Sequence, residues 1–330
     1  MRLGRTRGSM GDLQMKKIVL AAFAVLAASA VPVLAADLAV KAPPPPPPPL
    51  WDIAFGGGVM TDYNFRGISQ SDRGPSATAY FEPRFNISPN WQLYAGVAGW
   101  AVTLPTDPTA EIDLYGGIRA TFGAFAFDFG AMYYYYPKEK QHAAVFGAPF
   151  PPFPNGNTTL DDTDFWEVYG KGTYTFNDNV AAGLAVYYTP SWLNTGAPGT
   201  YLSGNVKLTA PGTWFPKDWG FYVSGELSHY WLGTTDVVTG VFGPPAWDLP
   251  DYTTWNIGIG VTYKVFTLDV RWYDTDLSKE ECNILTADPS ASFGGAVDPL
   301  RNPNGLRSNW CGSAVIAKLS ADLTALTNLK

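Results

Sequence analysis

The sequence predicts an all-β protein, a transmembrane antiparallel up-and-down β-barrel of about twelve strands, and three observations predict it. Apolar and polar residues alternate with a period of two over many long segments. Only 15% of the residues are charged, against about 25% in soluble domains, while 15% are aromatic. Beyond the N-terminal region, no apolar run approaches the roughly 20 residues of a membrane-spanning helix.

The N-terminal segment has the pattern of a Sec signal peptide. Lys16 and Lys17 precede the apolar run "IVLAAFAVLAASAVPVLA", which ends in small residues. We expect cleavage after Ala35, with Ala36 nearly as good, and Met15 as the natural start. The signal peptide is therefore predicted over residues 1–35. An N-terminal membrane anchor is the weaker alternative, because the run is short and no stop-transfer charges follow it.

A proline-rich linker is predicted over residues 36–50. Seven consecutive prolines, Pro43 to Pro49, favour a stiff polyproline II rod of roughly 20 Å. A periplasmic spacer is the favoured interpretation, and a ligand for a proline-binding partner is the alternative. The barrel is then predicted over residues 51–323, and residues 324–330 form a C-terminal tail.

Each predicted strand separates an apolar face from a polar one. In the first, Trp51, Ile53 and Phe55 alternate with small or polar residues, and the pattern continues to Phe65. A strand of this length suits a tilted bilayer crossing, which needs about 9–11 residues. The predicted strands cover residues 51–65, 78–87, 91–102, 111–122, 125–136, 164–176, 180–190, 200–209, 219–232, 253–265, 266–274 and 313–323.

The lengths of the connections support a barrel independently of the alternation. Every second connection is short ("SPN", "GA", "NDN" and "KVF", with a longer "APGTWFPKD"), and most of the others are long. Bacterial outer-membrane barrels have short periplasmic turns and longer external loops. A soluble β-sandwich would explain the alternation but not this rhythm.

Charge and cysteine content restrict the partners. Without residues 1–35 the chain loses 5 of its 22 basic and 1 of its 29 acidic residues, which leaves a net charge of −11 and argues against nucleic acid. Cys282 and Cys311 suit one disulfide in an exported protein, closing the last long loop. Two cysteines and two distant histidines are a poor zinc set, and neither a metal nor another cofactor is expected.

The segment "TDYNFRGISQSD", residues 61–72, resembles the TorF-type porins of Gram-negative bacteria. "EIDLYGG", "DFWEVYGKGTYTF" and "LDVRWYDTD" carry the resemblance across most of the barrel. The resemblance implies a barrel in the cell outer membrane, with outer-membrane lipid, small hydrophilic solutes and the barrel-assembly machinery as its partners. The sequence does not indicate whether barrels associate.

The polar faces supply the predicted pore-lining residues. If the apolar phase faces lipid, charged side chains line the lumen, and nearly balanced charge predicts at most a weak cation preference. The pairs Glu82 with Arg84 and Asp269 with Arg271 lie two apart on one face and suit ion pairs. The predicted lining is Asp62, Arg66, Glu82, Arg84, Glu111, Asp113, Arg119, Glu167, Lys171, Lys207, Glu226, Asp269 and Arg271, with Asp52, Asp128 and Lys264 on the same phase.

Arg66 has two equally favoured interpretations. It ends the first predicted strand beside a polar loop, so it suits a charge at the channel mouth. The alternative is an arginine that pairs with Asp62 or Asp72 and holds the loop.

A porin-like channel for passive diffusion of small hydrophilic solutes or ions is the favoured function. A plugged barrel with a structural or adhesive role is the main alternative, and a lipid hydrolase is a lesser one. No nucleophile-elbow or zinc motif supports catalysis, so an enzyme is not expected. His229 falls on the outward phase among aromatic residues, which suits an interfacial belt.

Overall fold

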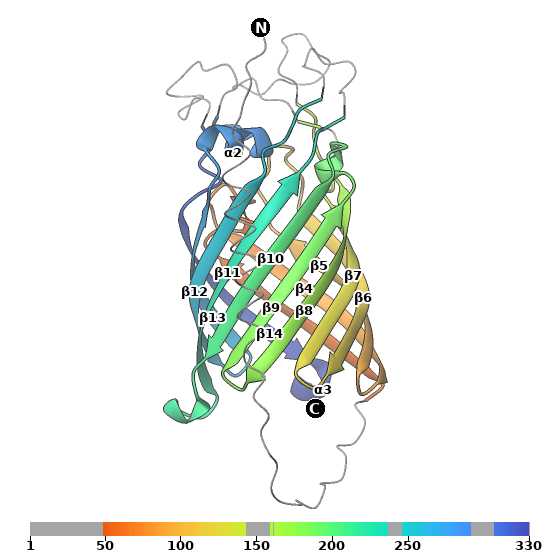
Figure 1. The fold of residues 1–330 in the computed structure, drawn as a ribbon, viewed down its shortest axis with the longest axis vertical. Helices are drawn as coiled ribbons and strands as arrows, with labels where there is room; N and C mark the ends of the chain where they lie inside the picture. Colours follow the sequence, from red (N-terminus) through yellow and green to blue (C-terminus); the bar gives the residue numbers. More distant parts are fainter. Residues whose placement is uncertain (1–48, 143–158, 161, 237–245, 292–306, 330) are drawn as a thin grey trace, which may run out of the picture. The chain divides into compact units, whose positions relative to one another are not determined.

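The computed structural model describes residues 49–142, 159–160, 162–236, 246–291 and 307–329. The predicted signal peptide, nearly all of the predicted linker and the proline-rich stretch at residues 149–154 lie outside these residues. From Trp51 onward the chain forms a closed barrel of twelve antiparallel strands, as the sequence predicts (Figure 1).

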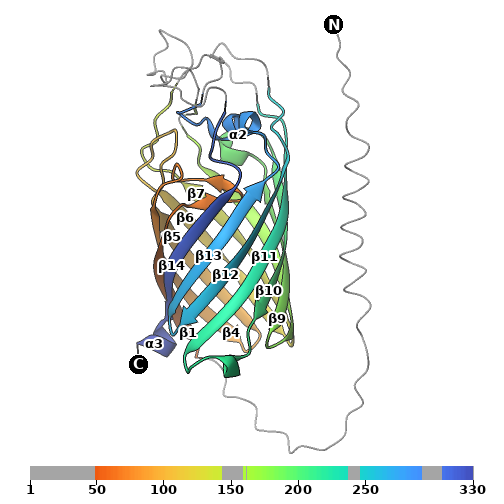
Figure 2. The same cartoon turned by 90° about the vertical axis from the view of Figure 1, so that its left-hand side faces the viewer.

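The barrel strands follow one another around the wall in chain order, and β14 returns to β1 (Figure 2). Each has ten or more residues, the length that a tilted bilayer crossing requires. Their bounds are β1 Trp51–Met60, β4 Ser76–Ser88, β5 Trp91–Trp100, β6 Glu111–Phe122, β7 Phe125–Tyr135, β8 Phe165–Asn177, β9 Val180–Thr189, β10 Gly199–Thr209, β11 Trp219–Leu232, β12 Tyr252–Tyr263, β13 Phe266–Thr275 and β14 Ala314–Thr324.

The last strand closes the barrel. β14 pairs with β13 from Ala314 to Ala321 and with β1 from Lys318 to Thr324. A short helix, α3 (Ala325–Asn328), follows it. Every wall strand therefore has a hydrogen-bonded neighbour on both sides, which is what a sheet without free edges needs in lipid.

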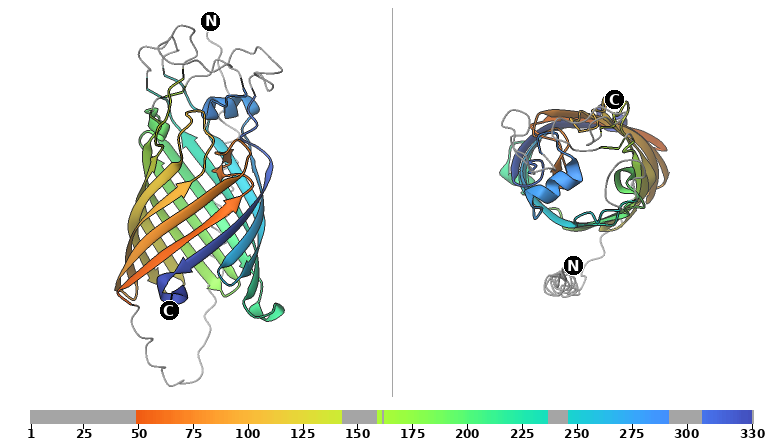
Figure 3. Two further views of the ribbon diagram at one scale, coloured as in Figure 1. Left: turned by 180° about the vertical axis from the view of Figure 1, so that it is seen from behind. Right: turned by 90° about the horizontal axis from the view of Figure 1, so that it is seen from above.

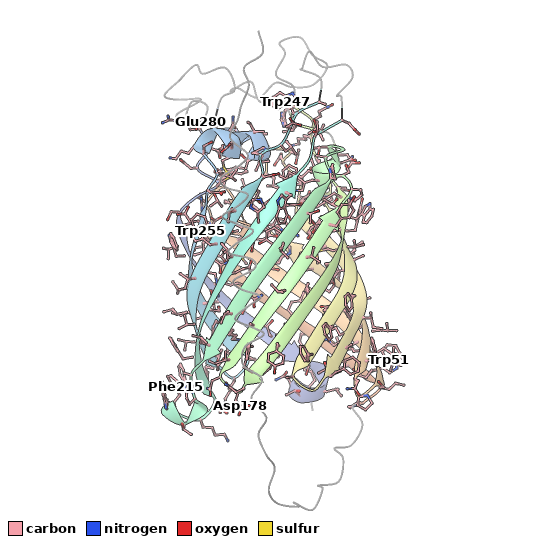
Figure 4. The ribbon with its side chains drawn as sticks, viewed as in Figure 1. Trp51, Asp178, Phe215, Trp247, Trp255 and Glu280 are labelled. Atoms are coloured by element: carbon pink, nitrogen blue, oxygen red, sulfur yellow. A yellow bond between two sulfur atoms is a disulfide. The ribbon has the colours of Figure 1, made fainter. Side chains whose placement is uncertain are left out.

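The connections divide between the two ends of the barrel. At one end lie the tight turns 89–90, 123–124, 178–179 and 264–265 and the longer connection 210–218, which contains η2 (Gly212–Trp214). At the other end lie the long loops, with β2 (Asn64–Phe65), β3 (Ile68–Ser69), η1 (Trp192–Asn194) and α2 (Lys279–Thr286). We call these the turn end and the loop end; in Figure 4, Asp178 and Phe215 mark the first, and Trp247 and Glu280 the second.

The outer surface of the wall is apolar. Aliphatic side chains such as Leu184, Val206 and Ile257 are exposed in the middle of their strands. Exposed aromatic side chains gather where strands reach the turn end (Trp51, Trp91, Phe122, Phe125, Trp219, Tyr263 and Phe266) and the loop end (Tyr133, Tyr135, Trp166, Tyr188 and Trp231). An apolar band between two aromatic girdles is the surface of a transmembrane β-barrel. Among the described residues, no helix has the length and apolar character to cross a membrane.

The outer face yields a stability prediction. Ile257 lies near the middle of β12 and faces outward. Its replacement by arginine would place a charge in the lipid band and should lower the free energy of unfolding by about 2–4 kcal/mol. Asn205→Arg on the inner face of β10 is the matched control and should change it little. Denaturant unfolding in lipid vesicles measures both, and equal losses would contradict the lipid-facing assignment.

The first strand is shorter than predicted. It ends at Met60 rather than continuing to Phe65, and residues 61–75 leave the wall. The alternation continues past Met60 because β2 and β3 are themselves extended, but these two short strands pair with each other as a separate hairpin.

Candidate functional site

The first loop, residues 61–75, folds into the barrel at its loop end. β2 and β3 form a hairpin whose two-residue turn is Arg66–Gly67, both with positive φ (51° and 90°). Turns of this kind match the twist of paired strands but require left-handed backbone at both positions. A Cβ at Gly67 would lie 2.6 Å from the Thr254 hydroxyl and would also clash with Thr275. The tip of the hairpin therefore presses against the wall formed by β12 and β13.

The Arg66 side chain reaches the opposite strands. Its two terminal nitrogens donate hydrogen bonds of 2.7 Å to the two carboxylate oxygens of Glu167 on β8. Only 6% of the Arg66 side chain and 1% of the Glu167 side chain are exposed. Burial alone would lower the pKa of Arg66, but Glu167 beside it raises that pKa well above its usual value. Arg66 therefore stays charged inside the barrel.

Aromatic rings surround this ion pair. The guanidinium carbon of Arg66 lies 4.7 Å from the ring centroid of Tyr187, 4.4 Å from that of Tyr201 and 5.0 Å from that of Tyr230. Phe65 of the hairpin adds a fourth ring at 4.7 Å. Such distances allow cation–π attraction, which is stronger where water is excluded.

Tyr63 attaches the beginning of the first loop to the wall. The Tyr63 hydroxyl donates to Glu111 on β6 (2.6 Å), and the Tyr63 ring stacks on Trp100 with centroids 4.4 Å apart. The Trp100 indole in turn donates to one oxygen of Asp113 (2.8 Å), while the other oxygen of Asp113 is buried without a hydrogen-bond partner. The loop thus contacts both sides of the lumen.

Asp62 organises the base of the loop. It accepts hydrogen bonds from Ser69 (2.6 Å), Ser71 (3.0 Å) and Arg73 (3.3 Å). Arg73 also donates to the carbonyl of Gly312, in the connection between β13 and β14. Asp62 is therefore a structural acceptor inside the loop.

The last loop packs against the hairpin. Cys282 of α2 and Cys311 form the predicted disulfide, and the Trp310 indole donates to Asp72 (2.8 Å). The Ser69 amide donates to the Trp310 carbonyl (2.8 Å). Viewed along the barrel axis, α2 lies inside the outline of the wall (Figure 3, right). The described parts of the two loops therefore meet inside the wall at the loop end.

Below the hairpin, charged side chains line the inner wall in two ion-pair networks. Glu82 accepts from Arg84 (2.6 Å) and Arg119 (2.8 Å), and these two arginine side chains are 24% and 30% exposed. Arg119 also pairs with Asp128 (3.5 Å). The second network lies on β13, on the other side of β1. There Arg271 pairs with Asp269 (3.0 Å) and donates to Asn256 and Ser224.

Two lysines on the inner wall rest on tyrosine rings. The Lys171 ammonium lies 4.2 Å from the Tyr169 ring centroid, and the Lys207 ammonium lies 4.2 Å from that of Tyr222. In the part of the chain that the structure describes, neither ammonium has a carboxylate within 4.0 Å. Glu226, on the neighbouring strand β11, accepts from Tyr201 and Ser228 instead.

The structure changes the interpretation of several predicted residues. Arg66 pairs with Glu167 rather than with Asp62 or Asp72, because the hairpin carries it across the lumen. Lys264 lies in the tight turn after β12, at positive φ, and not on the inner wall. Lys318 was missed: it follows the inward phase of β14, lies opposite Asp269 and approaches the Trp100 ring to 5.4 Å.

One group of acids at the loop end could hold a cation by distance alone. Carboxylate oxygens of Glu139, Asp162 and Asp164 lie within 4.8 Å of one another. They already accept hydrogen bonds from Thr163 and Tyr133 and from the Tyr136 backbone. Burial raises the pKa of Glu139 against the lowering effect of its bonds from Thr163. These hydrogen bonds within the loops account for the positions of the three carboxylates.

His229 lies on the outer face of β11. Its Nδ1 is 3.0 Å from the Thr253 hydroxyl, and its ring packs edge-on against Trp231 with centroids 4.5 Å apart. These contacts place His229 in the aromatic girdle at the loop end.

Comparison with known proteins gives a family match over part of the chain. Residues 49–149 match a family described as "Bacterial protein of unknown function (Gcw_chp)". The matched range begins at the first strand and includes the hairpin with Arg66, whereas Glu167 lies beyond it. No curated protein matches the chain. The resemblance to TorF-type porins stays a prediction.

Several solved structures resemble the barrel weakly. The KdgM porin is 11% identical with a TM-score of 0.38, covering 82% of this chain and 98% of its own. The NanC porin is 9% identical with a TM-score of 0.40, covering 83% and 100%. LpxR from Salmonella typhimurium is 7% identical with a TM-score of 0.39, covering 82% and 99%. At TM-scores below 0.5 these resemblances carry no argument about function, and the fold rests on the strand pairing.

Proposed function

We propose that this chain is an outer-membrane channel through which small hydrophilic solutes or ions diffuse passively, and that the first loop constricts it. The apolar outer band supports a place in a membrane, and the long/short rhythm of the connections supports the bacterial outer membrane. The polar inner wall supports a water-filled path rather than a lipid-filled one.

The observation that carries the proposal is the exposure of charged side chains inside the barrel. Arg84 and Arg119 point into the lumen and still keep 24% and 30% of their side-chain surface accessible. Lys207 is also exposed on the inner wall. This exposure supports a water-accessible lumen below the hairpin, with the hairpin as the narrow part of the proposed path.

Planar-bilayer recording of the refolded protein tests this function. We expect stable single-channel steps for the wild type. A variant in which a glycine–serine linker replaces residues 63–71 should show larger steps, because the side chains that cross the lumen are gone. Migration that changes on heating would verify that both barrels are folded. A wild type and a variant of equal conductance would contradict the constriction.

A plugged barrel is the second candidate, and one observation favours it. Ile68 of the hairpin, Trp310 of the last loop and wall residues such as Tyr134, Tyr230 and Tyr252 form one buried apolar cluster. If this cluster seals the loop end, the folded wild type will give no conductance while the linker variant will conduct. That result would assign the barrel a structural or surface role.

A further inference from the structure

We propose that Glu167 and the tyrosines around it form a binding site for planar organic cations, above all guanidinium groups, and that Arg66 occupies this site from within the chain. The inference rests on the proposed function in one respect only, since the ligand would be a solute that enters the lumen. The binding chemistry itself is independent of conduction.

The site belongs to the barrel wall. Glu167 is on β8, Tyr187 on β9, Tyr201 on β10 and Tyr230 on β11, which are neighbouring strands. Ring centroids are 6.2 Å apart between Tyr187 and Tyr201 and 5.5 Å apart between Tyr201 and Tyr230. Strands of a closed sheet hold side chains rigidly, so this arrangement does not depend on the hairpin for its geometry.

The carboxylate is oriented before any cation arrives. Tyr134 on β7 donates to one Glu167 oxygen (3.0 Å), and Tyr230 donates weakly to the other (3.5 Å). Both oxygens then remain able to accept the two parallel N–H groups of a guanidinium. Such bidentate pairing distinguishes a planar guanidinium from an ammonium, which offers only a point charge.

The guanidinium group that occupies the site belongs to the hairpin and not to the barrel wall. Arg66 sits at the tip of a hairpin whose strands have two residues each, in the loop that joins β1 to β4. Besides Phe65, which precedes Arg66 in the chain, the groups that surround its guanidinium lie on the wall. The wall thus presents a complete guanidinium receptor, and Arg66 acts as a tethered ligand. A free guanidinium would face the same carboxylate and the same three wall tyrosines.

A tether sets the concentration that a competitor must reach. Short flexible connections give effective concentrations of roughly millimolar, and the packed hairpin should present Arg66 at that value or above. A solute that carries a guanidinium group should therefore compete with Arg66 only at about millimolar concentration or above. Its binding would release the Arg66 side chain from Glu167.

Calorimetry on purified barrels in detergent tests the site. The probe is propylguanidinium, which copies the end of an arginine side chain, and propylammonium is the control probe. In the variant with a linker in place of residues 63–71 the site is vacant, and we expect propylguanidinium to bind at about millimolar Kd or tighter. We expect wild-type binding to be at least ~10-fold weaker, because Arg66 occupies the site.

Three further variants keep the test decisive. Glu167→Gln in the linker variant should weaken propylguanidinium binding by about 10-fold or more, since it removes the charged acceptor. In the full-length chain, propylguanidinium should stabilise Arg66→Ala against thermal unfolding. It should not stabilise Arg73→Ala, because Arg73 lies in the same loop but does not contact Glu167. Either equal binding of both probes or binding insensitive to Glu167→Gln would overturn the proposal.

The outcomes separate this inference from the proposed function. Calorimetry and thermal unfolding need no current through the barrel. Binding by the linker variant together with a silent wild-type channel would retain the site and reject the diffusion channel. Conductance without binding would reject the site and retain the channel.

Discussion

Glu167→Gln is expected to lower the free energy of unfolding of the barrel by about 3–5 kcal/mol, the usual cost of removing one partner of a buried ion pair. The large effect follows from burial: Glu167 is almost fully enclosed, and Arg66 would stay charged beside a neutral amide. The three wall tyrosines would still contact the guanidinium but could not replace the lost charge.

Equilibrium unfolding in denaturant, followed by tryptophan fluorescence, measures this loss. The double variant Arg66→Met/Glu167→Leu is the main control, and it should recover most of the stability because no charge is left buried. Arg84→Gln is the matched control, because Arg84 is partly exposed and Glu82 would keep its second partner, Arg119; it should cost less than about 1 kcal/mol. A Glu167→Gln barrel as stable as the wild type would show that the pair does not hold the hairpin.

The barrel could be predicted from the sequence because its causes are local. Each wall strand has one face toward lipid and one toward the lumen, so apolar and polar residues alternate along every wall strand. The two-residue turns Gly123–Ala124 and Asp178–Asn179 supply glycine or polar residues, and these mark the strand ends. The closing strand could also be predicted, since Val315 and Leu319 face outward and Lys318 follows the inward phase, as in the rest of the wall.

The centre of the site could not be predicted, because its contacts join residues far apart in the chain. Arg66 and Glu167 are separated by 101 positions, and their pairing depends on a loop leaving the wall. Alternation places Tyr187, Tyr201 and Tyr230 on the inner face but says nothing of what meets them there. One signal was available: several neighbouring strands carry an inward tyrosine near their loop end, which is unusual for a wall that faces only water.

Burial separates two classes among the predicted lining residues, while Glu82 is buried between Arg84 and Arg119 below the hairpin. Asp62, Glu111, Asp113 and Glu167 are all enclosed by the hairpin or its contacts. Arg84, Arg119, Lys171 and Lys207 lie on the inner wall below it and remain partly or largely exposed. A count of charges along the inward phase treats both classes alike. In the proposed channel the second class would face the solution, so it should dominate the ion selectivity.

The second large effect is expected from the disulfide. Replacing both Cys282 and Cys311 with serine should lower the free energy of unfolding of the last loop by about 3–4 kcal/mol, from the chain entropy of a loop of this length. The sulfurs join residues 29 positions apart, one in α2 and one beside Trp310. Since Trp310 accepts from Ser69 and donates to Asp72, the loss should spread to the hairpin.

Limited proteolysis and single-channel noise measure this effect on the two loops, and the reduced wild type serves as the control for the serine variant. We expect faster cleavage between β13 and β14 and a noisier or larger conductance. Migration that still changes on heating would show that the wall remains folded, because β14 pairs with β13 and β1 independently of the disulfide. Rapid cleavage of the last loop with an unchanged hairpin and conductance would mean that Arg66 and Tyr63 alone hold the constriction in place.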